Sequence, residues 1–180
     1  MTTRLPLPDP ADLSPEQRAV YDSIAASPRG RVRGPLLVLL HSPELAQKVQ
    51  DMGSALRFSR RLSRRIIELV ILMTAHHLAS AYVFAVHRET SQNAGLFDAD
   101  QCDAIARGEF PDGLDATEQA VGAFCRALLT SHDVDEDTFR AVHDRIGDAG
   151  TVDLVILIGY YHIGALLSNV AGLMPGAAEA

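Results

Sequence analysis

The chain has 180 residues, of which 47% are hydrophobic and 22% charged, and its formal net charge is −7. These values are typical of a folded domain and exclude a disordered or fibrous chain, and the length suggests a single domain. A general nucleic-acid binder needs a basic surface that replaces phosphate counterions, so we expect no nucleic-acid partner.

The two cysteines, Cys102 and Cys125, form neither a C-x-x-C motif nor a zinc-ligand spacing. Such sparse cysteine usage suits a reducing compartment. The first residues, rich in proline, lack the apolar run of a secretory signal. We therefore expect a cytoplasmic protein.

Helix-start signals recur along the chain, whereas the alternating hydrophobicity of strands is absent. Capping-box pairs stand at Ser14 and Gln17, at Asp98 and Gln101, and at Asp115 and Glu118. We predict an all-α fold with helices at residues 14–27, 42–58, 62–79, 80–94, 98–107, 115–131, 135–146 and 151–172. We also expect an extended lead-in over residues 1–13, one domain over 14–174 and a flexible tail over 175–180.

Two segments, 66–86 and 152–173, are far more apolar than the rest and approach the length of a membrane span. Each also holds ionisable or amide side chains, which are costly in hydrocarbon, so we expect no membrane partner. The pattern favours a helical bundle with two central, buried helices wrapped by shorter amphipathic ones. A neighbouring subunit is an alternative way to bury helices this apolar.

Glu68 and His87 are the most informative polar residues of these segments, because burying an ionisable group without a partner costs several kcal/mol. They stand 19 positions apart, which on one straight helix is roughly 28 Å. They can meet only if the chain turns between them, and Ser80, a candidate helix N-cap, predicts that turn near residues 79–80. The alternatives are that Glu68 pairs only with Arg64 or Arg65, and that His87 only caps its own helix.

Other polar side chains give weaker signals. A zinc site from His76, His77 and His87 lacks the ligand spacing of zinc proteins, and we expect no metal. Ser80 lies two turns from His87 on its helix, too far for a serine nucleophile and its base. Tyr160 and Tyr161 are more typical of core aromatics than of catalytic residues.

Taken in order, several segments resemble the carboxymuconolactone decarboxylase family, within the alkylhydroperoxidase D-like superfamily. The resemblance covers most of the chain and is carried by residues 13–21, 41–45, 56–58, 65–69, 82–87, 94–96 and 159–161. It implies an all-α fold and a homo-oligomer, a trimer or hexamer, with its sites near subunit contacts.

The redox branch of that superfamily has a glutamate, then a C-x-x-C motif, then a histidine four residues on. Glu68 and His87 match the outer pair, but Ser80 and Val83 stand where the cysteines should be. A thiol peroxidase needs thiolates, so the resemblance points to the cysteine-less branch. The Tyr-Glu-Trp sequence common there is Tyr82-Val83-Phe84 in this chain, so one carboxylate is missing.

The resemblance implies an acid/base enzyme without a cofactor, acting on a small organic acid, lactone or related ring by decarboxylation or isomerisation. We expect His87 to act as the acid and base, and Glu68 to orient His87 or relay its proton. The other expected site residues are the enolate donors Tyr82, His77 and Ser80 and the substrate contacts Arg57, Phe84 and Tyr161. The alternative is an oligomeric small-molecule-binding protein that has lost the chemistry.

Overall fold

The structure is a computed structural model that describes residues 3–58 and 60–176, and every regular element in these ranges is a helix. The predicted all-α fold is confirmed. The helices are α1 (Pro15–Ala26), α2 (Pro35–Leu39), α3 (Pro43–Phe58), α4 (Arg64–His77), α5 (Ala81–Asn93), α6 (Ala99–Ala106), α7 (Ala116–Ser131) and α8 (Glu136–Ala171).

Local capping explains where most of these helices begin. The three predicted capping boxes form, because the side chains of Ser14, Asp98 and Asp115 each accept from the third helical residue, whose own side chain accepts in return. Asp135 caps α8 by accepting from the Thr138 amide, and Ser63 caps α4. These are short-range interactions, which is why the sequence predicts them.

The structure differs from the predicted elements at two places. The short helix α2 was not predicted; it begins at Pro35, directly after Gly34, whose φ of 57° is positive. The two predicted helices at 135–146 and 151–172 form one run, α8, with a kink at Gly147, where φ is 68°. Glycine adopts this left-handed conformation without steric cost, so it can turn the chain there.

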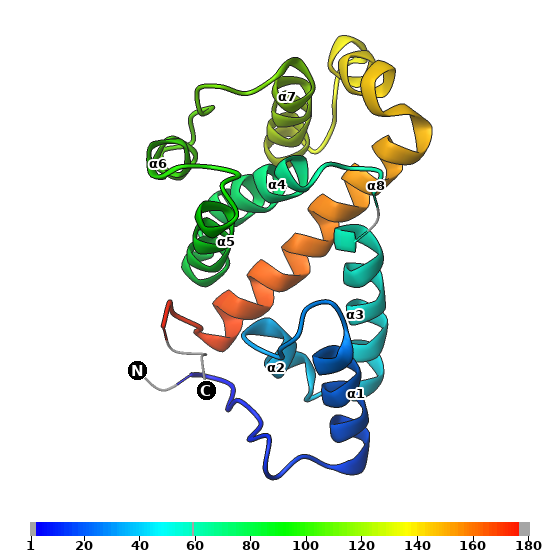
Figure 1. Ribbon diagram of the computed structural model, residues 1–180, viewed down its shortest axis with the longest axis vertical. Helices are drawn as coiled ribbons and strands as arrows, with labels where there is room; N and C mark the ends of the chain where they lie inside the picture. The colour runs from blue at the N-terminus through cyan, green and yellow to red at the C-terminus, as the bar shows by residue number, and fades with distance from the viewer. Residues whose placement is uncertain (1–2, 59, 177–180) are drawn as a thin grey trace.

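Helix α8 crosses the molecule diagonally, with α4 and α5 on one side and α2 and α3 on the other (Figure 1). Helix α4 contacts α5, α6, α7 and α8. Its residues from Ile66 to Leu72 are all buried, as expected for a central helix.

Helix α8 is buried on its inner face only, so the expectation of burial on most sides is wrong for the single chain. Leu154, Leu157 and Ala165 are fully buried, whereas a stripe on the other face is exposed. By length and composition α8 could cross a membrane. Its inner face belongs to the main hydrophobic core, so we interpret it as a core helix with one uncovered side.

The two ends of the domain meet. The amide of Arg4, in the irregular lead-in, donates to the carbonyl of Ala171 at the end of α8. Of the predicted tail, residues 177–180 lie outside the described residues.

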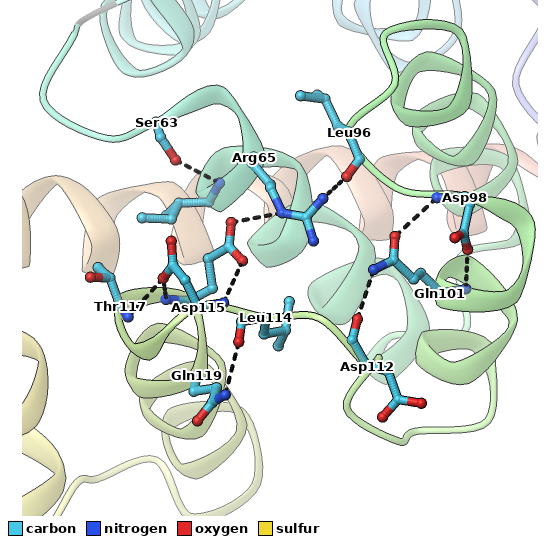
Figure 2. Close-up of polar contacts among 12 residues, drawn as sticks. Ser63, Arg65, Leu96, Asp98, Gln101, Asp112, Leu114, Asp115, Thr117 and Gln119 are labelled. Carbon is cyan, nitrogen blue, oxygen red and sulfur yellow. Dashed lines mark hydrogen bonds and ion pairs between the residues drawn. The ribbon is translucent and has the colours of Figure 1, made fainter.

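Arg65 joins three parts of the bundle (Figure 2). Its Nε lies 2.7 Å from the buried Glu118 carboxylate of α7, its Nη1 donates to the Leu96 carbonyl, and its guanidinium stacks 4.3 Å from the Phe97 ring. Arg65 therefore fixes the positions of α4, α7 and the α5–α6 connection relative to one another.

We expect Arg65→Met to destabilise the fold by roughly 2–3 kcal/mol, because it leaves the buried Glu118 charge without its partner. The exposed pair of Arg61 with Asp153 gives a matched control, and Arg61→Met should cost less than about 1 kcal/mol. Urea unfolding measures both; equal effects of the two substitutions would contradict the role of Arg65.

Candidate active site

Glu68 and His87 form a buried hydrogen bond across the α4–α5 hairpin. The Oε2 of Glu68 lies 2.7 Å from the Nδ1 of His87. The contact exists because α4 ends at His77 and α5 begins at Ala81, with a tight turn between them in which Ala79 has a positive φ of 49°. The predicted turn and the predicted meeting of the two side chains are confirmed.

Both carboxylate oxygens of Glu68 have partners, which explains how a side chain only 1% exposed remains ionised. Its Oε1 lies 3.8 Å from the Nη2 of Arg57 on α3. The alternative partner Arg65 binds Glu118 instead. Arg57 thus lies beside Glu68 and also lines the cavity that His87 lines, and its expected contact with a substrate stays a prediction.

The environment favours a neutral His87 beside an ionised Glu68. Burial lowers the pKa of His87 below its ordinary value of 6.5, and the attraction of Glu68 offsets this only in part. The pKa of Glu68 is also lowered: burial acts to raise it, but His87 and Arg57 outweigh that effect. Because the unfolded chain binds a proton at His87 more readily than the folded chain, stability falls as the pH drops below 6.5.

This charge state fixes the roles of the two ring nitrogens. A carboxylate can only accept, so the Nδ1–H of neutral His87 donates to Glu68 and Nε2 carries a lone pair. Among the residues that the structure describes, none forms a hydrogen bond with Nε2. His87 lines a cavity, and Nε2 is the nitrogen available there as a base.

The cavity beside His87, termed here the inner cavity, has a volume of about 120 Å³ and apolar walls with several polar groups. Its polar lining comprises Arg29, Arg33, Arg57, Tyr82, His87, Thr90, Tyr160 and Tyr161. Polar groups that converge on a mostly apolar cavity are typical of a small-molecule site.

Two tyrosines of α8 form one wall of this cavity. The ring of Tyr161 meets the His87 ring edge to face at 5.3 Å between centroids. Burial raises the pKa of Tyr161, so its hydroxyl stays protonated and can donate. The Tyr160 hydroxyl accepts from the Nη2 of Arg29, and Gly53 makes room for it, since a Cβ there would lie 2.1 Å from that oxygen.

Of the other predicted site residues, Tyr82 reaches the inner cavity, while His77, Ser80 and Phe84 do not line it. His77 is exposed at the end of α4 and lines a separate depression with His76. The buried Ser80 stands at the N-cap of α5, but its side chain makes no capping bond and donates to the Ala165 carbonyl. Phe84 packs between hydrophobic clusters. These three side chains therefore lie outside the inner cavity, and their expected contact with a substrate stays a prediction.

Sequence reasoning missed Arg29, Arg33 and Tyr160. The first two lie in the Gly/Pro-rich loop before α2, outside every predicted helix. A signal was present, because Arg29, Arg31 and Arg33 alternate in a loop that lacks acidic residues.

The two cysteines lie away from this site. Both are buried and free, and burial raises the pKa of Cys102 and raises that of Cys125 to about 12. Neither lines the inner cavity. These thiols are poor sources of thiolate at neutral pH.

No protein-family model and no curated protein sequence matches the chain. Solved structures do. An uncharacterised peroxidase-related protein from Ralstonia eutropha with an alkylhydroperoxidase AhpD core has a TM-score of 0.81 at 19% identity, covering 98% of this chain and 94% of its own. A peroxidase-related protein from a Silicibacter species gives 0.77 at 19% identity, with 97% and 92% coverage. A debrominase in its apo form gives 0.75 at 13% identity, with 98% and 92% coverage.

These likenesses show that the chain has the AhpD-like fold over nearly its whole length. At such low identity they show the fold alone.

The pKa of His87 should lie below 6.5, and Glu68→Gln should lower it further, because the neutral amide no longer stabilises the imidazolium. NMR titration of the histidine ring signals measures this. His143 is an internal control: its pKa is raised by Asp148 and should not respond to the substitution. A His87 pKa above 6.5, or one unmoved by Glu68→Gln, would contradict the electrostatic account.

Proposed function

We propose that this chain is an acid/base enzyme that needs no cofactor and acts on a small organic acid, lactone or related ring by isomerisation or decarboxylation. The observation that carries the proposal is the Glu68–His87 hydrogen bond at the wall of the inner cavity. A buried carboxylate that orients a neutral imidazole is a common arrangement for moving a proton at carbon. One structural neighbour is a debrominase, so the fold is compatible with enzymatic activity.

The proposed chemistry begins with a substrate carboxylate bound to Arg57, whose guanidinium can form a bidentate pair of hydrogen bonds with it. In an isomerisation, the lone pair of His87 Nε2 takes a proton from the carbon beside a carbonyl. The electrons of that C–H bond form an enolate, and Tyr161 donates a hydrogen bond to its oxygen. The imidazolium, stabilised by Glu68, then returns the proton to a different carbon.

In a decarboxylation, the C–C bond breaks instead, its electrons form the enolate, and carbon dioxide leaves. His87 must then carry a proton from water before it protonates the carbon. Since the pKa of His87 is lowered, the neutral base predominates at pH 7, and this favours the isomerisation over the decarboxylation.

The proposal excludes a thiol peroxidase. That reaction needs a reactive thiolate next to its acid/base residues, whereas Ser80 and Val83 occupy the positions that cysteines hold in the redox branch. The buried Cys102 and Cys125 lie outside the site and have raised pKa values.

A second candidate is a small-molecule-binding protein without catalysis. It is favoured by Val83, which lines the inner cavity and stands where the cysteine-less branch of the family that the sequence resembles commonly has a glutamate. The two candidates share the cavity and differ only in whether a bound ligand exchanges a proton.

A screen of carboxylate-bearing unsaturated lactones and keto acids in deuterated water distinguishes these candidates, since an acid/base enzyme places deuterium at the carbon that gains the proton. We expect His87→Ala to lower that rate by about 10²- to 10⁴-fold, the usual contribution of a general base. Replacing Cys102 and Cys125 by serine should leave it unchanged. Ligand binding without deuterium incorporation would support the binding protein, and loss of turnover in the cysteine variant would contradict the mechanism.

We also propose that the chain forms a homo-oligomer through the exposed face of α8. This outer stripe consists of Val152, Val155, Ile156, Ile163, Leu166 and Val170, which recur at helical spacing over about 27 Å. An exposed apolar stripe of this length is typical of a surface that another protein chain covers.

The pattern of the stripe suits a second copy of the same chain. Gly159 is exposed at its middle, with Val155 and Ile163 four residues to either side and Val152 and Leu166 seven to either side. Two antiparallel copies related by a two-fold axis at Gly159 would therefore place Val155 opposite Ile163 and Val152 opposite Leu166, so that apolar side chains face one another. Such a contact gives an even number of subunits, so of the two expected states it favours the hexamer. Ile163 also lines the inner cavity, so a partner there would close the site.

Light scattering should give a mass well above the 19.4 kDa of one chain. Leu166→Glu should shift the protein towards the monomer, because it would bury an unpaired charge in the contact. The matched control is Leu45→Glu, an equally exposed leucine on α3 outside the stripe. A wild-type monomer, or dissociation by both substitutions alike, would contradict the α8 contact.

A further inference from the structure

A second, larger chamber adjoins the inner cavity and is lined by arginine. Its volume is about 720 Å³, and its charged lining consists of Arg29, Arg31, Arg33, Arg57, Arg60, Arg64 and the single acid Glu68. Six of the 16 lysine and arginine residues thus gather in one chamber of a chain whose net charge is −7. We call it the arginine chamber.

Among the described residues, the carboxylates do not balance the positive charge of three of these arginines, Arg31, Arg60 and Arg64. Glu68, the chamber's one carboxylate, is already engaged by His87 and Arg57. Among the described residues, no carboxylate forms an ion pair with Arg31, Arg60 or Arg64. Like charges held together repel one another, and an anion from solution is the partner that relieves this repulsion.

Neighbouring arginines in the sequence show that the lack of a carboxylate partner is particular to the chamber. Arg60 and Arg64 line it, whereas Arg61 pairs with Asp153 and Arg65 with Glu118. The buried Nε of Arg29, a residue that lines both cavities, makes no hydrogen bond. Unused guanidinium donors therefore stand in the chamber, whereas the adjacent Arg61 and Arg65 are each paired with a carboxylate.

The number of donors indicates which anion fits. A carboxylate has two oxygens and one charge, which one guanidinium satisfies. A phosphate group has three free oxygens and a charge near −2, and so can engage several arginines at once. The acidic remainder of the chain, which gives it a net charge of −7, does not suit a nucleic-acid duplex.

We infer that the arginine chamber binds the phosphate group of a small organic ligand, whose unphosphorylated end reaches His87 in the inner cavity. The two cavities share Arg29, Arg33, Leu36, Arg57 and Thr90 as lining residues and therefore lie side by side, and the inference requires that one molecule extend from the chamber into the inner cavity. The inference rests on the proposed function only in placing the reacting end at His87. Phosphate binding itself requires no turnover, so the phosphate site can fail its test while the catalytic proposal holds, and the reverse.

Calorimetric titration of the full chain with inorganic pyrophosphate, at constant ionic strength and pH 7.5, tests this inference. We expect saturable binding, and we expect Arg60→Gln and Arg64→Gln each to weaken it about tenfold through the loss of a charge-assisted contact. Both residues are exposed, so neither substitution removes a core contact. Arg61→Gln, next to Arg60 but paired with Asp153, is the matched control and should bind as wild type.

Citrate, whose three carboxylates give it a charge similar to that of pyrophosphate at pH 7.5, serves as the comparison probe and should bind more weakly than pyrophosphate. Three results would overturn the inference: no saturable pyrophosphate binding, equal weakening by Arg61→Gln, or citrate binding as tight as pyrophosphate. Pyrophosphate binding combined with no deuterium incorporation into any tested acid would instead support the chamber and count against the catalytic proposal.

Discussion

The buried hydrogen bond between Glu68 and His87 is the interaction on which the site depends. A carboxylate this deeply buried is stable only with charged or hydrogen-bonding partners on both oxygens. The α4–α5 turn supplies one of them and the end of α3 supplies the other, through Arg57. The site therefore requires three helices to be packed correctly, and the Arg65 contacts with α7 and with the α5–α6 connection hold α4 in that position.

Electrostatics divide the region around this pair into two parts. On the side of the inner cavity stand the neutral imidazole and the tyrosines of α8, together with the three arginines that both cavities share, Arg29, Arg33 and Arg57. On the other side, Arg31, Arg60 and Arg64 add further guanidinium groups, and Glu68 is the single carboxylate. Glu68 lines the arginine chamber and His87 the inner cavity, so their hydrogen bond joins the two parts. The positive charge is therefore greater on the side of the chamber, which favours an orientation with the anionic end of a ligand there.

The sequence predicts the local parts of this structure well. The capping boxes involve residues three apart, and the meeting of Glu68 with His87 follows from a helix break readable at Ser80. The sequence does not predict contacts between residues that only tertiary packing brings together. Arg29 donates to Tyr160, which lies 131 positions away in the chain. The side of α4 on which His77 emerges likewise depends on how the helices pack.

A double-mutant cycle tests most directly whether Glu68 and His87 act as one unit. With a substrate in hand, kcat/KM is measured for wild type, Glu68→Gln, His87→Ala and the variant that carries both. The account predicts that the double variant loses less than the product of the two single losses, because Glu68 acts only through His87. Losses that multiply independently would contradict it.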